Sequence, residues 1–250
     1  MRAARAESIS LLAALDGRLC GTKIPRFWRT HLVFPVVAAT IALLWLELAD
    51  GNRLIADQLY VWEGGQWLLR DHRITSNWIH HGGKQLSLAL WVMALMLRLR
   101  IRDASAFANW RRPLTYLLLA TLAATMLVSG LQMLTSMDCP WDMQGYGGLR
   151  PYIALFDVRP DGLKSAACFP AGHASAGYCW VALYFFFAAL VPRWRWRGLA
   201  FGLGLGAVFG LSQQLRGAHF LSHDVMTLLI CWLTALASYV LMCAQRRTAQ

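Results

Sequence analysis

The stretch VMTLLICWLTALASYVLMC, residues 225–243, contains no charged side chain and decides the class of fold. As an α-helix with a rise of 1.5 Å per residue it is roughly 28 Å long, close to the hydrocarbon thickness of a bilayer. A buried helix of a soluble bundle is the alternative for a single stretch of this kind. The chain as a whole is 57% hydrophobic and only 15% charged, which favours a membrane protein.

Five further apolar runs precede this one. We predict membrane-spanning helices at roughly 32–49, 84–97, 113–134, 174–192, 197–215 and 225–243. So many nearly uncharged runs exclude a soluble bundle, and no linker, low-complexity tract or repeat separates them. Gly202, Gly206 and Gly210 lie four residues apart in the fifth run, where they permit close helix packing. The predicted fold is one all-α membrane domain over residues 1–250.

The basic residues predict how the six helices are oriented. With the N-terminus in the cytoplasm, most of the 24 Lys and Arg residues fall at the N-terminus, around 98–112, at 193–197 and at 246–247. Cytoplasmic loops carry such an excess, so both termini are predicted to be cytoplasmic. The segments 50–83, 135–173 and 216–224 are then outside. The net charge of +11 is explained as a topology signal, so no nucleic-acid partner is expected. The arginine-rich start lacks the apolar core of a removable signal peptide.

The outer segments have distinctive compositions. Residues 50–83 mix Trp62, Trp67 and Trp78 with charges, which predicts one or two amphipathic helices at the membrane interface or a lid over a site. Cys139 and Cys168 share the next outer loop, and in an oxidising compartment they are expected to form a disulfide. Two unpaired thiols are the alternative. The cysteine spacing is not that of a metal site, so no metal is expected.

Two histidine segments lie at the outer mouths of apolar runs. The first is Phe169-Pro170-Ala171-Gly172-His173-Ala174-Ser175, and the second is Arg216-Gly217-Ala218-His219-Phe220-Leu221-Ser222-His223-Asp224. A lone histidine is usually structural, but His173, His219 and His223 are all predicted to lie in one layer. His219 and His223 are four residues apart and share a helix face if this stretch is helical. The set supplies an imidazole nucleophile, an imidazole acid and a cation, Arg216, for an anionic group.

These segments resemble the signatures of the type 2 phosphatidic acid phosphatases. Pro170-Ala171-Gly172-His173 looks like the second signature, Pro-Ser-Gly-His, and Gly217-Ala218-His219-Phe220-Leu221-Ser222 looks like the third. The six-span topology also matches, and the resemblance covers about 113–243. It implies phosphoryl transfer without a metal or another cofactor. His219 is then the nucleophile that forms a phosphohistidine, and His173 protonates the leaving oxygen and later activates water.

The resemblance leaves the partner of the nucleophile open. The family has an Asp four residues after the third-signature His, where this chain has His223, followed by Asp224. Either side chain can accept the hydrogen bond from the ring nitrogen that does not attack. A second reading makes His223 the nucleophile.

The chain departs from the family at its cations. The first signature, Lys, six residues, then Arg-Pro, matches best at Gln132 and Cys139-Pro140, and Gln213 stands at the third-signature Arg. Because phosphate needs positive charge around it, the expected replacements are Arg216, Lys164 and Arg150, with Arg159 a weaker candidate. Gly172 begins a helix whose backbone donors also face the phosphate.

The resulting hypothesis is a phosphatase or phosphotransferase at the periplasmic face of a bacterial inner membrane. The resemblance suggests a phosphorylated lipid as its partner in the bilayer, of the lipid A, undecaprenyl pyrophosphate or phosphatidylglycerol phosphate type. A non-catalytic protein that binds or transports such a lipid is the alternative, favoured by the missing cations. A solute transporter has less support, because the predicted spans contain almost no charge.

Overall fold

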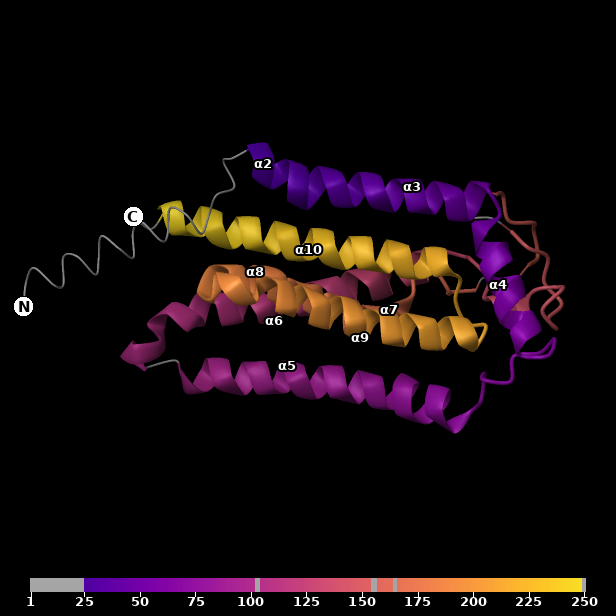
Figure 1. Ribbon diagram of the computed structural model, residues 1–250, viewed down its shortest axis with the longest axis horizontal. Helices are drawn as coiled ribbons and strands as arrows, with labels where there is room; N and C mark the ends of the chain where they lie inside the picture. Colours follow the sequence, from indigo (N-terminus) through magenta and orange to yellow (C-terminus); the bar gives the residue numbers. More distant parts are fainter. Residues whose placement is uncertain (1–24, 102–103, 154–156, 164–165, 249–250) are drawn as a thin grey trace, which may run out of the picture.

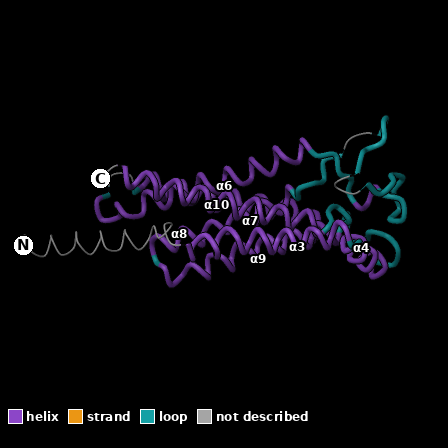
Figure 2. The backbone as a smooth tube through the Cα atoms, turned by 90° about the horizontal axis from the view of Figure 1, so that it is seen from above, coloured by secondary structure: helices purple, strands orange, loops and turns teal. Residues whose placement is uncertain are grey.

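The computed structural model describes residues 25–101, 104–153, 157–163 and 166–248, with only the backbone for 244–248. The described residues form helices and loops without a named strand, apart from one isolated bridge between Met143 and Arg150. The all-α prediction is confirmed for this part of the chain. Long helices run side by side, and the longest loops gather at one end of the bundle (Figures 1 and 2).

The long helices are α3 (Phe34–Leu48), α5 (Gly82–Arg100), α6 (Ala108–Leu134), α9 (Arg195–Leu215) and α10 (Leu221–Thr248). A further crossing is made of α7 (Gly172–Tyr178), η6 (Cys179–Ala182) and α8 (Leu183–Leu190). The shorter elements are α2 (Pro25–Trp28), η2 (Arg29–Val33), α4 (Gly51–Trp62), η3 (Ile74–His81), η4 (Ser105–Phe107), η5 (Pro140–Asp142) and η7 (Pro192–Trp194).

Five helical segments are long and apolar enough to cross a membrane. They are Pro25–Leu48, Ser105–Leu134, Gly172–Leu190, Pro192–Leu215 and Leu221–Cys243. The predicted run at 84–97 is helical as part of α5 but is not among the five. Its polar residues Lys84, Gln85 and Arg98 lower the mean hydropathy of that helix below that of the others. Six spans and the sides of the termini therefore stay predictions.

Glycines on one face of α9 let it pack directly on the α7–η6 segment. A Cβ atom at Gly206 would lie 2.0 Å from the Tyr178 ring, and one at Gly202 would lie 2.3 Å from the Val181 nitrogen. No side chain fits at such distances, so the two backbones approach as only glycine permits. The packing role predicted for these glycines is confirmed. The close packing of α9 on the α7–η6 segment holds the start of α7 beside the α9–α10 turn.

The two ends of the bundle differ in composition. One end, which we call the loop end, carries α4, η3, the loop over 135–171 and the turn at Gly217 (Figure 1). The opposite end, the arginine end, carries Arg98, Arg111 and Arg195 near helix termini. All three histidines singled out in the sequence lie at the loop end, because α7 and α10 both begin there.

Candidate active site

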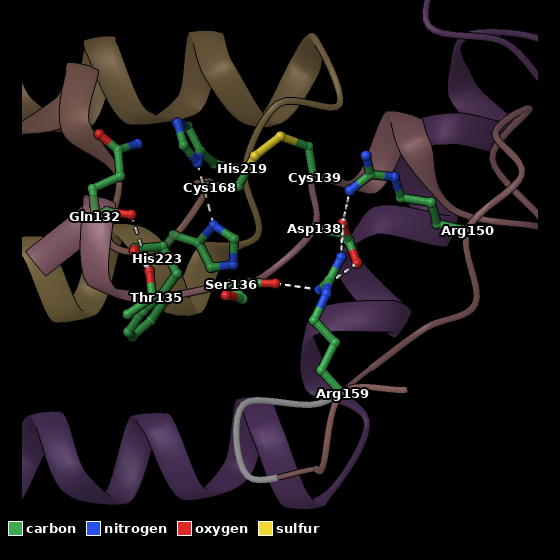
Figure 3. The surroundings of a disulfide bond; sticks show 11 residues. Gln132, Thr135, Ser136, Asp138, Cys139, Arg150, Arg159, Cys168, His219 and His223 are labelled. Carbon is green, nitrogen blue, oxygen red and sulfur yellow. Dashed lines mark hydrogen bonds and ion pairs between the residues drawn. A yellow bond between two sulfur atoms is a disulfide. The ribbon is translucent and has the colours of Figure 1, made fainter. Parts of the chain in front are cut away.

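His219 and His223 form a directly contacting pair. The chain turns at Gly217, which has a positive φ of 67°, and α10 then begins at Leu221, so both imidazoles lie around the first turn of this helix. Their Nδ1 atoms are 3.2 Å apart (Figure 3). His223 is fully buried and His219 is 9% exposed. With the proton on His219 Nδ1 donated to His223 Nδ1, the lone pair of His219 is on Nε2, where it can attack.

The first histidine segment packs on the second. The Ala171 backbone N–H donates to the His223 carbonyl over 3.3 Å, and the Thr227 hydroxyl donates to the Ala171 carbonyl over 3.2 Å. The Phe169 ring meets the His223 ring edge to face, with centroids 5.3 Å apart. These contacts bring His173, two residues after Ala171, close enough to His219 for their charges to interact.

A histidine that the sequence analysis did not select lies against His173. The His80 ring centroid is 4.4 Å from that of His173, and the Nδ1 atom of His80 is buried without a partner among the described residues. Lys84, one helical turn further on, interacts electrostatically with both imidazoles. Burial, with the charges of Lys84 and Arg216, lowers the pKa of His80 to about 4.

Arg216 reaches into the same cluster. Its Nε donates to the Arg70 carbonyl over 2.7 Å, and one terminal nitrogen donates to Gln213 Oε1 over 3.2 Å. A guanidinium has five N–H donors, so these two bonds leave donors for an anion. Desolvation lowers the pKa of Arg216 from its ordinary value, and the residue is buried, at 9% exposure.

His219 is neutral at physiological pH in this setting. Burial lowers its pKa to about 4, opposed by the Cys168 carbonyl and assisted by the charges of His80 and Arg216. A neutral imidazole keeps the lone pair that a nucleophile requires. Two mutually oriented imidazoles, a third beside them, the buried Arg216 and the exposed Lys84 therefore form an arrangement suited to transfer of an anionic group.

The family signature covers this same part of the chain. The model of the PAP2 superfamily matches residues 113–247. The chain belongs to the PAP2 superfamily. This membership confirms the resemblance drawn from the histidine segments, and it implies phosphatase activity on phosphorylated lipids. Neither a curated protein nor a solved structure matches the chain. His80 and Lys84 precede the matched segment, although the structure places them at the PAP2 histidines.

The two glutamines that replace PAP2 cations lie at the site. Gln213, at the third-signature Arg position, accepts the hydrogen bond from Arg216, so the displaced guanidinium returns to the neighbourhood of the missing one. Gln132, matched to the first-signature Lys, lies against Gly172, where a Cβ atom would be 2.4 Å from its Oε1. Gly172 thus allows a close approach of α6 to the start of α7. Lys84 is the further cation near this place.

Other predicted site residues lie apart from the PAP2 histidine pair. Asp224 accepts a 2.6 Å hydrogen bond from Gln214, and a Cβ atom at Gly210 would lie 2.3 Å from its Oδ2. Its carboxylate therefore lies against α9, whereas His223 contacts His219. Arg150 and Arg159 both pair with Asp138, which is 1% exposed (Figure 3). Lys164 lies outside the described residues.

The loop over 135–171 is tied to the PAP2 site by a disulfide and by backbone bonds. Cys139 and Cys168 are joined with their Cα atoms 5.5 Å apart. The Trp141 N–H donates to the Gly217 carbonyl over 2.9 Å, next to the turn that carries His219. Among the described residues, no group of three His, Cys, Asp or Glu side chains is arranged to hold a metal ion.

The segment over 51–81 covers the site. A small cavity of about 10 Å³ beside His219 is lined by Asn52, Trp67 and Gln214 among others. This is about the space of one water molecule. The Trp67 ring lies so close to Gly217 that a Cβ there would be 2.4 Å away. Side chains of this segment must therefore move before a phosphate group can enter this cavity. The composition of this segment allowed either interfacial helices or a lid, and it did not distinguish between them.

Proposed function

We propose that this PAP2 member transfers phosphate from a phosphorylated lipid through a phosphohistidine on His219. The observation that carries the proposal is the His219–His223 contact, with Nδ1 atoms 3.2 Å apart. In the first step His219 Nε2 attacks phosphorus while Nδ1–H donates to His223. The bond from phosphorus to the lipid oxygen breaks, and His173, which takes up a proton once the anionic head group lies beside it, gives that proton to this oxygen. The products are the dephosphorylated lipid and phosphohistidine.

The second step returns the enzyme to its starting state. His173, now neutral, removes a proton from water as the water oxygen attacks phosphorus, and the N–P bond breaks to release inorganic phosphate. An acceptor lipid in place of water gives phosphotransfer. Arg216 and Lys84 stabilise the charge that spreads over the phosphoryl oxygens in both steps. A neutral His219 needs no prior deprotonation.

The position of the site supports a lipid substrate. His219 lies at the loop end, next to the apolar helices α9 and α10, so a head group could reach it while acyl tails stay among the helices. With the orientation predicted from the basic residues, this end faces the periplasm of a bacterial inner membrane. Lipid A, undecaprenyl pyrophosphate and phosphatidylglycerol phosphate are then the substrate types to test.

The test is phosphate release by purified protein from a panel of these lipids in mixed micelles, with and without chelator. We expect release that survives the chelator and is lost in His219→Ala and His173→Ala. His72→Ala is the matched control, since His72 is exposed and outside the histidine cluster. An acid-quenched reaction with labelled lipid should show phosphate on His219. Full activity in His219→Ala would remove the mechanism.

The missing PAP2 cations favour a second candidate, a protein that binds the phosphorylated lipid without cleaving it. Gln132 and Gln213 stand where the signatures carry charge. The same panel separates the two functions. Saturable lipid binding that is lost in Arg216→Gln, together with no phosphate release by the wild type, would support the binding protein over the enzyme.

A further inference from the structure

A large cavity in the described part of the chain is lined by none of His80, His173, His219 and His223. It measures about 1310 Å³ and lies between α2–α3 on one side and α8, α9 and α10 on the other. We call it the α3 groove. Its lining on α10 runs from Val225 to Tyr239, which is roughly 21 Å along the helix axis. The volume exceeds the roughly 300–1,000 Å³ of usual small-molecule pockets.

The α3 groove exists because α3 packs loosely. Only 11% of the most apolar stretch of Pro25–Leu48 is buried, which is the lowest fraction among the five candidate spans. Ala38, Ala39 and Ala42 face the groove from α3, and their small side chains leave space that Leu228 and Trp232 on α10 do not fill. A long, mostly apolar channel of this kind suits a hydrocarbon chain.

One end of the α3 groove is strongly basic. Arg26, Arg29 and Arg195 line it, and its lining includes no Asp or Glu. Within the described residues, none of the three guanidiniums forms an ion pair with a carboxylate. The nearby polar groups are already bonded, since His31 Nε2 lies 2.9 Å from the Tyr184 hydroxyl. In the part of the chain that the structure describes, the three positive charges therefore have no partner of opposite charge, and they lie at the end of a channel that fits an acyl chain.

We propose that the α3 groove binds an anionic phospholipid, with its phosphate held by Arg26, Arg29 and Arg195 and an acyl chain along α10. A zwitterionic lipid is disfavoured because it would bring its own cation to this cluster. Free phosphate would leave the apolar channel unused. This lipid is not the substrate: Arg195 and Leu215 are at opposite ends of α9, roughly 30 Å apart, so a head group at Arg195 lies far from His219.

The bound lipid would join α3 to α8 and α9 by filling the space between them. The far end of α3 leads into α4. Glu47 in α3 accepts a 2.9 Å hydrogen bond from Asn52 in α4, and Asn52 also donates to Ser222 over 2.8 Å. The same helix thus contacts the lipid along its length and the covering segment of the active site at its end.

Native mass spectrometry of the full chain in neutral detergent tests the proposal. The protein is titrated with dioleoyl phosphatidylglycerol or with dioleoyl phosphatidylcholine. We expect at least about tenfold tighter binding of the anionic lipid. Replacing Arg26→Gln and Arg195→Gln together should weaken it about 25-fold, since each surface arginine contributes about fivefold. The matched control is Arg193→Gln with Arg197→Gln, which removes two charges at the same end but outside the groove. It should change binding less than about twofold.

A groove-filling variant separates a channel site from general surface attraction. Ala42→Trp should lower binding of phosphatidylglycerol with all three arginines in place, and glycerol 3-phosphate should not compete in the wild type. Equal affinity for the two lipids, or equal losses in the two arginine pairs, would overturn the proposal. The proposal would also be overturned if the number of lipids bound per protein were the same in Ala42→Trp and the wild type, with thermal stability unchanged. If Ala42→Trp does not fold, the comparison of the two arginine pairs alone tests the proposal. Protein–protein cross-linking through the groove would instead identify a second copy of the chain as its occupant.

Discussion

The His219–His223 contact makes the sharpest prediction. His223→Leu removes the acceptor for His219 Nδ1 and places an apolar side chain in a fully buried position. His223→Asn is its matched partner, because the side-chain oxygen of Asn can occupy about the place of the imidazole Nδ1. The two variants differ in whether His219 keeps a hydrogen-bond acceptor.

The size of the effect follows from burial. In His223→Leu the buried His219 Nδ1–H loses its acceptor at 3.2 Å, which costs about 1–3 kcal/mol. The ring also loses the partner that selects its tautomer and orientation, a loss of about 10²- to 10⁴-fold in catalytic rate in comparable triads. We expect kcat to fall by at least about 10²-fold in His223→Leu and by about tenfold or less in His223→Asn.

The assay is release of inorganic phosphate from the best lipid of the panel, with the yield of trapped phosphohistidine measured in parallel. Thermal unfolding in detergent shows whether each variant is folded. A folded His223→Leu protein within about threefold of wild-type kcat would refute the orienting role. Phosphate trapped on His223 in the wild type would instead make that residue the nucleophile.

Three further outcomes follow from the structure. Arg216→Gln should reduce kcat/KM by about 10²-fold, which is the effect of removing one donor to a developing oxyanion. Adding Gln213→Arg to this variant should recover part of the lost activity. No recovery would show that the two positions do not bind the same phosphate. Breaking the disulfide with Cys139→Ser and Cys168→Ser should lower stability by on the order of 3 kcal/mol for a sequence separation of 29 residues, measured by thermal unfolding. Because the pKa of His219 is about 4 in the fold and about 6.5 in the unfolded chain, the unfolded chain binds more protons between these values. The free energy of unfolding should therefore fall as the pH drops from 6.5 to 4. In the pH–rate profile, the limb due to the nucleophile should lie near pH 4. A limb near pH 6.5 would contradict the argument that burial lowers the pKa of His219.

Local sequence patterns predicted much of the fold and part of the site. Apolar runs predicted the positions of the helices, because hydrophobic length is a property of contiguous residues. The second run was the exception, since Lys84 and Gln85 at its start make α5 less apolar than the candidate spans. His173 and His219 stood out because each lies in a short signature, and PAP2 membership confirms the family those signatures indicated.

The covering segment was harder to assign. His80, Lys84 and Arg70 follow no signature and precede the PAP2 match, so nothing adjacent in the chain connects them to His173. One signal was present: Arg70, Arg73 and Lys84 lie in a part of the chain where the charge rule predicts few basic residues. Charge count alone cannot distinguish a site residue from a solvated one, and contact between η3 and α7 depends on how α5 packs.

The sequence by itself determined the helical membrane class and the family, and it predicted His173 and His219 as the principal histidines, because these depend on composition and on residues close together in the chain. Only the tertiary structure decided which side chains lie beside them. His223 rather than Asp224 contacts His219, Arg216 returns to Gln213, Arg150 pairs with Asp138, and the α3 groove opens between helices distant in sequence. Each of these outcomes depends on which side chains from separate helices share a buried volume, and hydrogen-bond geometry at about 3 Å is set by that packing.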